Sequence, residues 1–232
     1  NAASRGGSQI WLEPGEEMTL ETMLKAIAIV SANDACVAVA EYLYGTVDNF
    51  VDKMNAKAQA LGLKDTYFYN TNGLPPDDNR TQGNYTTAYD MAVMARELLK
   101  HARILEWSST WIDHIRGGES VLNNTNRMVR HYPGCDGLKT GYTYEARHCI
   151  TSTAKREGLR FIAVIMGART SSSRFDEAAR LLNYGFNIYE SYKVAAEGEV
   201  IRQININNAR SPEIDIQVKE ALMVPVPRDK ED

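Results

Sequence analysis

The amino-acid sequence predicts an α+β fold in which helices come first and an antiparallel sheet follows. Apolar residues recur every three or four positions between residues 20 and 98, a spacing typical of amphipathic helices. Strand-like texture replaces this spacing between residues 137 and 166, and an alternation of apolar and polar residues follows residue 192. Helices and strands that are segregated along the chain in this way are typical of α+β domains.

The composition excludes two broad classes of function. The sequence has 232 residues, with 30 Asp and Glu against 26 Lys and Arg, so its formal net charge is -4. Nucleic-acid binding requires a concentrated excess of Lys and Arg, which is missing. The longest apolar stretches, residues 26–30 and 161–166, are far shorter than the roughly 20 residues that span a bilayer. With 44% hydrophobic and 24% charged residues, the composition is that of a soluble globular protein.

The cysteine and histidine residues do not form a recognisable metal motif. Cys36, Cys135 and Cys149 are too few and too scattered for a disulfide framework, and the sequence contains no Cys-x-x-Cys pair. His131-x-x-x-Cys135 and His148-Cys149 are short of the three or four converging ligands that tetrahedral zinc requires. We therefore expect no metal site and no cofactor.

The elements of the N-terminal half are predicted from their end signals. Residues 9–12 have the texture of a short strand, closed by a Pro-Gly turn. Thr19 is suited to cap a helix over residues 20–30, which breaks at the polar tripeptide 31–33. The spacing and the stop signals predict three further helices, over residues 34–44, 50–61 and 91–98.

The second half is predicted to begin with strands. An irregular segment over residues 70–85 comes first, and a loop of that length inside a compact domain is usually functional. Strands are expected at residues 137–143, 149–154 and 159–166, followed by a helix over residues 175–189 and then by alternating strands. We expect residues 1–192 to form one α+β domain and residues 193–232 to begin a second, β-rich domain that is truncated.

Two short motifs stand out as carriers of chemistry. Ser31-Ala32-Asn33 lies at a break between helices, and Lys139-Thr140-Gly141 lies in a strand. Together and in this order they match two of the three motifs of serine acyl-transferases that act on penicillin and D-alanyl peptides. The surrounding segments make the match specific; they are residues 8–16, 31–35, 50–55, 70–74, 85–92 and 136–143.

Through these segments the sequence resembles the low-molecular-weight penicillin-binding proteins. These are serine-type D-Ala-D-Ala carboxypeptidases, which trim the stem peptides of peptidoglycan. The resemblance covers nearly the whole chain and implies a β-lactamase/transpeptidase-like domain, with an antiparallel sheet and flanking helices, followed by the start of a β-rich domain. It also implies action through an acyl-enzyme and inhibition by β-lactams.

The resemblance implies a substrate-binding role for five residues. Lys139 and Thr140 would hold the terminal D-Ala carboxylate, which requires a cation and hydroxyl donors. Gly141 lacks a Cβ and would let the substrate backbone lie close to the strand. The backbone N–H of Tyr142 would form half of the oxyanion hole. Arg174 matches a family position near the carboxylate pocket, although it could equally be a surface residue in the first turn of a helix.

Three residues are expected to be catalytic: Ser31, Asn33 and Lys139. Asn33 would hold the amide carbonyl of the substrate. Ser31 would pass a proton toward the leaving D-Ala, together with the lysine of the family's first motif.

That first motif, Ser-x-x-Lys, supplies the nucleophile and base and lies upstream of the segment that matches residues 8–16. Positions i and i+3 of a helix share a face, so the lysine can reach the serine. The single Ser-x-x-Lys of the sequence, Ser152 to Lys155, lies in a predicted strand, where residues three apart face opposite sides. We therefore expect a fragment truncated at both ends, which lacks the catalytic helix and is inactive on its own.

Two alternatives remain open from the sequence. A class A-like β-lactamase shares both motifs but needs a glutamate to activate the deacylating water, and residues 70–85 contain no Glu. A non-catalytic peptidoglycan-binding module would keep the cleft without the nucleophile. The expected partners are a peptidoglycan stem peptide ending in D-Ala-D-Ala and β-lactam antibiotics, with no nucleic acid and with membrane association only through segments absent here. The family implies an extracytoplasmic location at the outer face of the cytoplasmic membrane.

Overall fold

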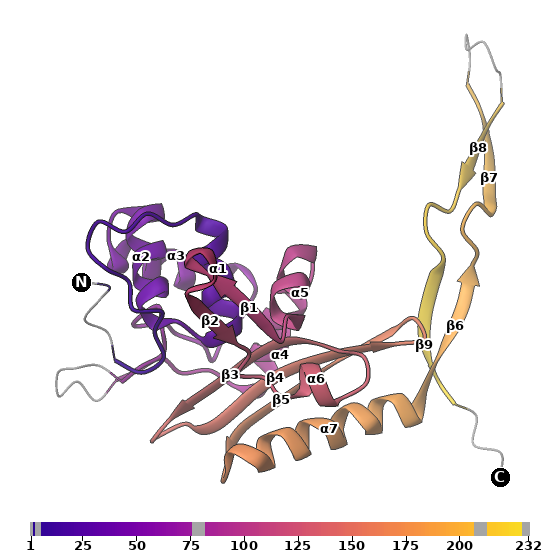
Figure 1. The fold of residues 1–232 in the computed structure, drawn as a ribbon. Coiled ribbons are helices and arrows are strands. Elements are labelled where there is room, and N and C mark those ends of the chain that lie inside the picture. The colour runs from indigo at the N-terminus through magenta and orange to yellow at the C-terminus, as the bar shows by residue number, and fades with distance from the viewer. Residues whose placement is uncertain (1, 3–5, 76–81, 207–212, 229–232) are drawn as a thin grey trace. The chain divides into compact units, whose positions relative to one another are not determined.

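The computed structural model describes residues 2, 6–75, 82–206 and 213–228 (Figure 1). The chain forms two compact units. Unit 1 comprises Asn1–Ala154 and Ile162–Leu182, and unit 2 comprises Lys155–Phe161 and Asn183–Asp232. The predicted domain boundary at residue 192 stays a prediction.

The first four helices of unit 1 correspond to helices predicted from the sequence, whereas the fifth, α5, was not predicted. These five are α1 (Leu20–Val30), α2 (Asn33–Tyr44), α3 (Val47–Ala60), α4 (Ala88–Leu98) and α5 (Ala102–Ser109). Thr19 accepts the N–H of Thr22 at 3.1 Å, which confirms its role as N-cap of α1. Thr87 caps α4 in the same way, by accepting the N–H of Asp90 at 3.1 Å. The predicted break between α1 and α2 is also confirmed, although α2 starts one residue early.

The main sheet of unit 1 has three strands in the order β3-β4-β5. They are β3 (Cys135–Thr143), β4 (Arg147–Arg156) and β5 (Leu159–Ala168), and the helix α7 (Ser171–Ile188) follows. β3 and β4 are antiparallel, with Lys139 opposite Thr151 and Gly141 opposite Cys149. The three strands and the helix that follows them were all predicted from the sequence pattern.

Besides α5, four elements of three or four residues in unit 1 have no counterpart in the sequence predictions. β1 (Ile112–Ile115) and β2 (Ser120–Asn123) form an antiparallel hairpin around the 3-10 turn η2 (Arg116–Gly118). α6 (Met128–His131) is a single helical turn before β3. Segments of three or four residues are too short to show a period, so tertiary contacts decide their structure.

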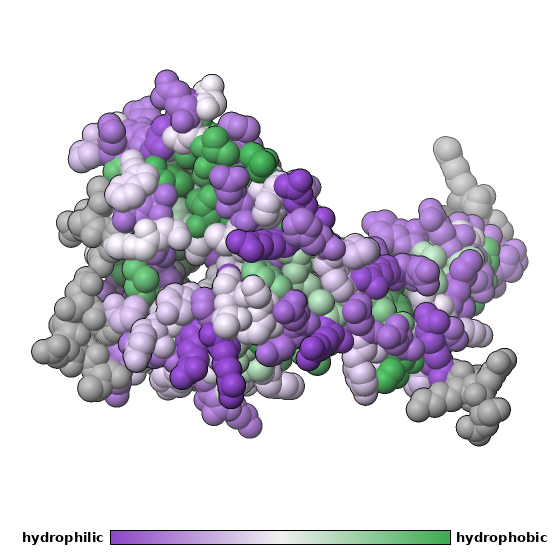
Figure 2. Space-filling model, turned by 60° about the horizontal axis from the view of Figure 1, so that its bottom comes forward, coloured by the Kyte–Doolittle hydropathy of each residue, from purple (hydrophilic) through white to green (hydrophobic). Residues whose placement is uncertain are grey.

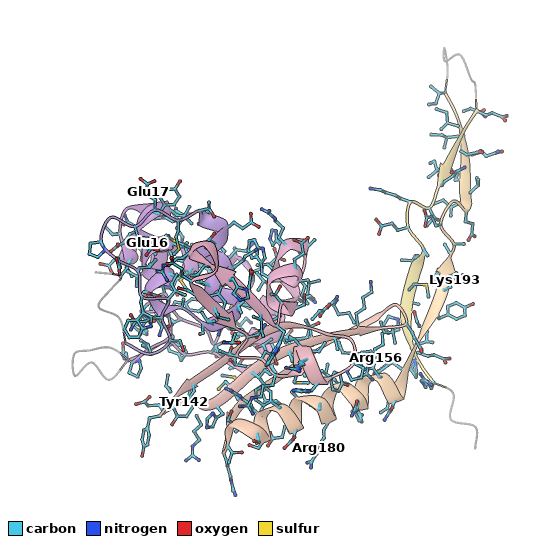
Figure 3. All side chains as sticks on the ribbon, viewed as in Figure 1. Glu16, Glu17, Tyr142, Arg156, Arg180 and Lys193 are labelled. Carbon is cyan, nitrogen blue, oxygen red and sulfur yellow. The ribbon has the colours of Figure 1, made fainter. Side chains whose placement is uncertain are left out.

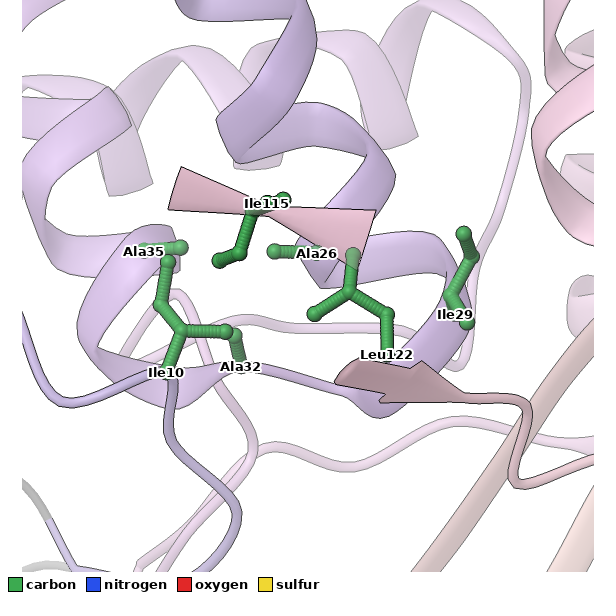
Figure 4. Packing of buried hydrophobic residues seen from close by; sticks show 7 residues of the cluster. All are labelled: Ile10, Ala26, Ile29, Ala32, Ala35, Ile115 and Leu122. Carbon is green, nitrogen blue, oxygen red and sulfur yellow. The ribbon is translucent and has the colours of Figure 1, made fainter. Parts of the chain in front are cut away.

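Small side chains let α1 and α2 pack closely beside the β1–β2 hairpin (Figure 4). Ala26, Ala32 and Ala35 are fully buried in this cluster, together with Ile29 and Leu122. Interiors pack to a uniformly high density, so alanines at these positions allow a close approach of the two helices. The tripeptide 31–33, which joins α1 to α2, is therefore held between well-packed elements.

The strand predicted at residues 9–12 is wrong, although the turn at Pro14-Gly15 is present. The backbone N–H groups of Ile10 and Leu12 do not pair with a neighbouring strand. They donate instead to the carboxylate of Asp34, at 3.1 to 3.2 Å. A side chain from another part of the chain thus satisfies these groups, and the sequence pattern of residues 9–12 does not reveal this.

Unit 2 contains two antiparallel strand pairs. β6 (Tyr189–Ala195) pairs with β9 (Leu222–Pro227), and β7 (Val200–Asn205) pairs with β8 (Glu213–Gln217). These pairs show that the alternation beyond residue 192 corresponds to strands. Phe161 packs edge-to-face against Phe186 in the same unit, with ring centroids 4.9 Å apart.

Hydrophilic residues cover much of the visible face in Figure 2, and hydrophobic residues gather in separate patches. Among the described residues, no helix combines the length and apolar character needed to cross a membrane.

Candidate active site

A cleft of about 600 Å³ in unit 1 brings together all seven residues predicted for the site. They come from the α1–α2 junction, from β3 and from the first turn of α7; they are Ser31, Asn33, Lys139, Thr140, Gly141, Tyr142 and Arg174. The segment 72–74 also lines the cleft. This places part of the irregular loop 70–85 at the site, while residues 76–81 lie outside the described part of the chain.

Ser31 ends α1 in a left-handed conformation, with φ 65° and ψ 40°. Non-glycine residues rarely adopt this conformation, and they retain it where the surrounding structure holds them. The left-handed residue stops α1, and α2 begins two residues later. The sharp change of direction places Ser31 at the wall of the cleft.

Asn33 is 7% exposed and is held by the N-terminal segment. Its backbone N–H donates to the Ser8 oxygen at 2.8 Å, and its Nδ2 donates to the Gly6 oxygen at 2.9 Å. A Cβ at Gly7 would lie 2.7 Å from this Nδ2, so only glycine fits there. The amide predicted to bind substrate thus uses one of its two N–H groups to bind the chain itself.

Asp34 is a further positioning residue, which the sequence predictions missed. Its carboxylate is fully buried and accepts the N–H groups of Ile10, Leu12 and Ala35. A buried carboxylate needs such partners to offset its lost hydration. One feature of the sequence could have identified Asp34: it is an acidic residue at the start of an otherwise largely apolar helix.

Lys139 is the central cation of the cleft. Its Nζ donates to the Thr140 oxygen at 2.7 Å. Burial lowers the pKa of Lys139 to about 8; the nearby Cys36 raises it and the positive charge of Arg174 lowers it further. Burial also raises the pKa of the Cys36 thiol to about 11, so this thiol stays neutral near pH 7.

The next three residues of β3 differ in their exposure and in their contacts with the rest of the chain. Thr140 is 7% exposed, and its hydroxyl donates to the hydroxyl of Thr125 at 2.7 Å. A Cβ added to Gly141 would meet no atom within 4 Å, so the fold itself does not require glycine there. Tyr142, which is labelled in Figure 3, is 59% exposed near the end of the β3–β4 hairpin. Its ring centroid lies 4.5 Å from that of His148.

Arg174 is buried, with 9% of its surface exposed, and is therefore no surface residue. Its Nη1 donates to the oxygens of Gly141 and Cys149, at 3.1 and 3.4 Å. Its Nη2 reaches the Ser171 hydroxyl at 3.3 Å. Its buried Nε has no hydrogen-bond partner among the described residues. Burial is the main cause that lowers the pKa of Arg174.

Ser152 and Lys155 lie on opposite sides of β4, as predicted. Ser152 is fully buried and donates to the Gly137 oxygen at 2.9 Å, whereas Lys155 is exposed. The two side chains therefore cannot form a nucleophile–base pair. No group of three or more His, Cys, Asp or Glu that could hold a metal ion occurs among the described residues.

Comparisons with known proteins agree over sequence and fold. A family model described as D-alanyl-D-alanine carboxypeptidase matches residues 1–170. The chain is 44% identical to the D-alanyl-D-alanine carboxypeptidase DacF of Bacillus subtilis over 227 residues, which cover 97% of this chain and 57% of DacF. It is 31% identical to DacC of Escherichia coli, with 98% and 56% covered. The chain thus spans little more than half the length of these relatives.

Solved structures show the same likeness. Penicillin-binding protein 3 of Streptococcus pneumoniae, described as a peptidoglycan synthesis regulatory factor, has a TM-score of 0.81 at 26% identity, with 99% of this chain and 68% of that chain covered. The carboxypeptidase DacD of Francisella tularensis has a TM-score of 0.77 at 27% identity, with 98% and 67% covered.

Proposed function

The chain belongs to the D-alanyl-D-alanine carboxypeptidase family, and from this premise we propose that it forms the substrate cleft of a serine-type D-Ala-D-Ala carboxypeptidase. Family membership confirms the resemblance found in the sequence motifs, and the structural matches confirm the transpeptidase-like α+β fold. The proposed reaction removes the terminal D-Ala of a peptidoglycan stem peptide through an acyl-enzyme. β-Lactams are the proposed inhibitors.

One observation carries this proposal: three separate segments line one cleft, and they supply a half-buried lysine beside a buried hydroxyl, a Ser-x-Asn turn and a buried arginine. A peptide that ends in a carboxylate requires such a cation and a hydroxyl donor. Lys139 supplies the charge, and Arg174, which lines the same cleft and donates to the Gly141 oxygen, adds a second cation. The open space at Gly141 leaves room for a peptide backbone along β3.

The other residues act on the amide that is cleaved. Asn33 Nδ2 has two N–H groups; one donates to the Gly6 oxygen, and the other donates to a carbonyl of the substrate. The Tyr142 N–H stabilises the negative charge that develops on the attacked carbonyl oxygen. Ser31 donates its proton to the departing D-Ala nitrogen and regains one from the lysine of the Ser-x-x-Lys motif, which has taken it from the attacking serine, so that D-Ala leaves as a neutral amine.

The attacking group is not Ser152, because its hydroxyl is buried and bonded to Gly137. We propose that the 232 residues bind substrate without reacting and that acylation requires a Ser-x-x-Lys helix from further residues. On a helix, the lysine amine lies on the same face as the serine and can take its proton.

Intact-mass measurement after incubation with benzylpenicillin tests this proposal. The 232-residue chain should gain no mass, while the full-length gene product should gain one penicilloyl group. An adduct on the isolated chain would contradict the proposal that the 232 residues bind substrate without reacting. Absence of any adduct on a full-length product that contains Ser-x-x-Lys would contradict the carboxypeptidase proposal.

The β-lactamase alternative is tested by nitrocefin. Residues 70–85 carry no Glu to activate a deacylating water, so we expect a long-lived acyl-enzyme and negligible turnover by the full-length product. Rapid nitrocefin hydrolysis would favour a β-lactamase.

The proposed substrate also indicates on which side of the cytoplasmic membrane the protein acts. Peptidoglycan lies outside the cytoplasmic membrane, so we propose an extracytoplasmic site of action. The peptidoglycan stem peptide and β-lactams are the proposed partners.

A further inference from the structure

The Thr125 hydroxyl lies in the cleft and is not used by the proposed reaction. Its Oγ1 accepts the hydrogen bond from Thr140 Oγ1 at 2.7 Å, and both residues line the cleft. Thr140 itself is almost fully buried. In this structure the proton of the Thr140 hydroxyl is therefore directed at Thr125.

A rigid turn holds Thr125 in this position. On one side of it, Asn124 is buried and donates from Nδ2 to two backbone oxygens, at 2.9 and 2.8 Å. On the other side, Asn126 is fully buried and donates to the Gly137 oxygen at 3.0 Å. The N–H of Thr125 donates to the Ile29 oxygen at 3.0 Å. The turn thus connects the end of α1 with the strand that carries Lys139.

The number of protons in the hydroxyl pair limits what Thr140 can do. Each hydroxyl has one proton, and a carboxylate has none to offer. While Thr140 donates to Thr125, it has no proton left for an anionic ligand. To bind a carboxylate, Thr140 must turn its own proton toward the ligand, and its Oγ1 is then free to accept the proton of Thr125.

We propose that Thr125 is a positioning residue that sets the donor direction of Thr140. In the free cleft Thr125 accepts the Thr140 proton, and on binding of a carboxylate it donates its own proton to Thr140 in return. The inference rests on the proposed function, because it takes the ligand to end in a carboxylate. It assigns a role to a residue that lies 15 positions from Thr140 and outside the recognised motifs.

The test compares two peptides that differ only in the terminal charge. N-acetyl-D-alanyl-D-alanine and its C-terminal amide are titrated into the 232-residue chain, and dissociation constants are measured from NMR shifts. We expect the unmodified chain to prefer the acid. Thr125→Val has the same shape without the hydroxyl and should reduce that preference about three- to tenfold, the range typical of one hydrogen bond.

Two further variants separate positioning from damage to the cleft. Thr125→Ser keeps the hydroxyl and should retain the preference for the acid. Thr143→Val removes a hydroxyl that lines the same cleft but accepts the Ala146 N–H at 3.0 Å, and it should also retain the preference. The amide should bind Thr125→Val as well as it binds the unmodified chain.

The possible outcomes distinguish this inference from the proposed function. If the unmodified chain does not prefer the acid, both fail. If it prefers the acid and Thr125→Val keeps the full preference, the role of Thr125 is wrong and the proposed function stands. Equal weakening of both peptides in Thr125→Val, without recovery in Thr125→Ser, would also overturn the inference.

Discussion

The position of Lys139 in the cleft destabilises the charged form of its ammonium group. Burial and the neighbouring Arg174 both disfavour its charge, and its pKa is lowered to about 8. Near pH 7 the group is still mostly protonated and can hold a carboxylate. Because the pKa lies close to physiological pH, the charge of the cleft depends on small changes of pH.

This value predicts a loss of carboxylate binding in mild alkali. From pH 7 to pH 9 the affinity for N-acetyl-D-alanyl-D-alanine should fall about tenfold, in step with the protonated fraction of a group titrating near 8. Lys139→Arg should remove this step, because a guanidinium stays charged. Titration by NMR at several pH values measures both. A flat profile for the unmodified chain would show that Lys139 does not hold the carboxylate.

The stability of the fold should change in the opposite direction. The folded-state pKa of Lys139 lies below the usual value of 10.5, so the unfolded chain binds more protons between pH 8 and 10.5. The contribution of this group to the free energy of unfolding therefore rises as the pH increases through that window. Urea denaturation of the unmodified chain and of Lys139→Met, compared across the window, isolates this contribution.

Substitution of Gly141 tests separately whether the peptide lies against β3 at this position. A Cβ there meets no protein atom, so Gly141→Ala should leave the free energy of unfolding unchanged or raise it by up to about 1 kcal/mol. A methyl group facing the peptide should weaken its binding about tenfold, which corresponds to the cost of modest overpacking. Unaltered peptide affinity in a folded Gly141→Ala variant would place the peptide elsewhere.

At the scale of elements, the N-terminus of α2 joins the Ser31 turn to the N-terminal segment. Asn33 and Asp34, the first two residues of the helix, bind backbone groups of residues 6–12. These bonds replace the strand pairing that the sequence of residues 9–12 suggests. They also hold the Ser31 turn in place from its far side.

Asp34→Asn should therefore be strongly destabilising. The amide would turn a donor toward N–H groups that need an acceptor, at a cost of about 2–4 kcal/mol in the free energy of unfolding. Asp48→Asn is the matched control, because Asp48 lies in the first turn of α3 but is exposed. It should change stability by less than about 0.5 kcal/mol. Equal urea midpoints for the two variants would contradict the role of Asp34.

Thr19 and Thr87 were predictable as capping residues because each accepts an N–H only three residues ahead. Thr46 caps α3 in the same way, but this cap was missed, because the helix was predicted to begin at residue 50. The α5 helix was missed, since its N-terminal residue His101 provides no side-chain cap. Its position depends on tertiary packing, including the burial of Trp107.

At the scale of the whole molecule, the two units differ in how many of their side chains are buried. The β3–β4–β5 sheet carries fully buried residues such as Ile150 and Ala154. The strands β6 to β9 of unit 2 form pairs only, and their side chains are mostly exposed. Isolated two-stranded ribbons are marginally stable in water.

Hydrogen exchange should therefore be faster in unit 2. We expect amides of β7 and β8 to exchange at least about tenfold faster than those of β3 and β4, because local opening costs less where little apolar surface is buried. Exchange followed by mass spectrometry on the 232-residue chain measures this difference. Equal protection in the two units would indicate that β7 and β8 are stabilised by contacts beyond their own pairing.

The sequence by itself determined the α+β class, the capped helices, the strands of the main sheet and the two motifs that identify the family. These features depend on local spacing or on short residue patterns. Only the tertiary structure decided that the motifs share one cleft, that Asn33 is already bonded to Gly6, that Asp34 replaces a strand partner, and that Thr125 meets Thr140. The physical reason is that burial and hydrogen-bond partners come from residues far apart in the chain, and no local pattern encodes which of them meet.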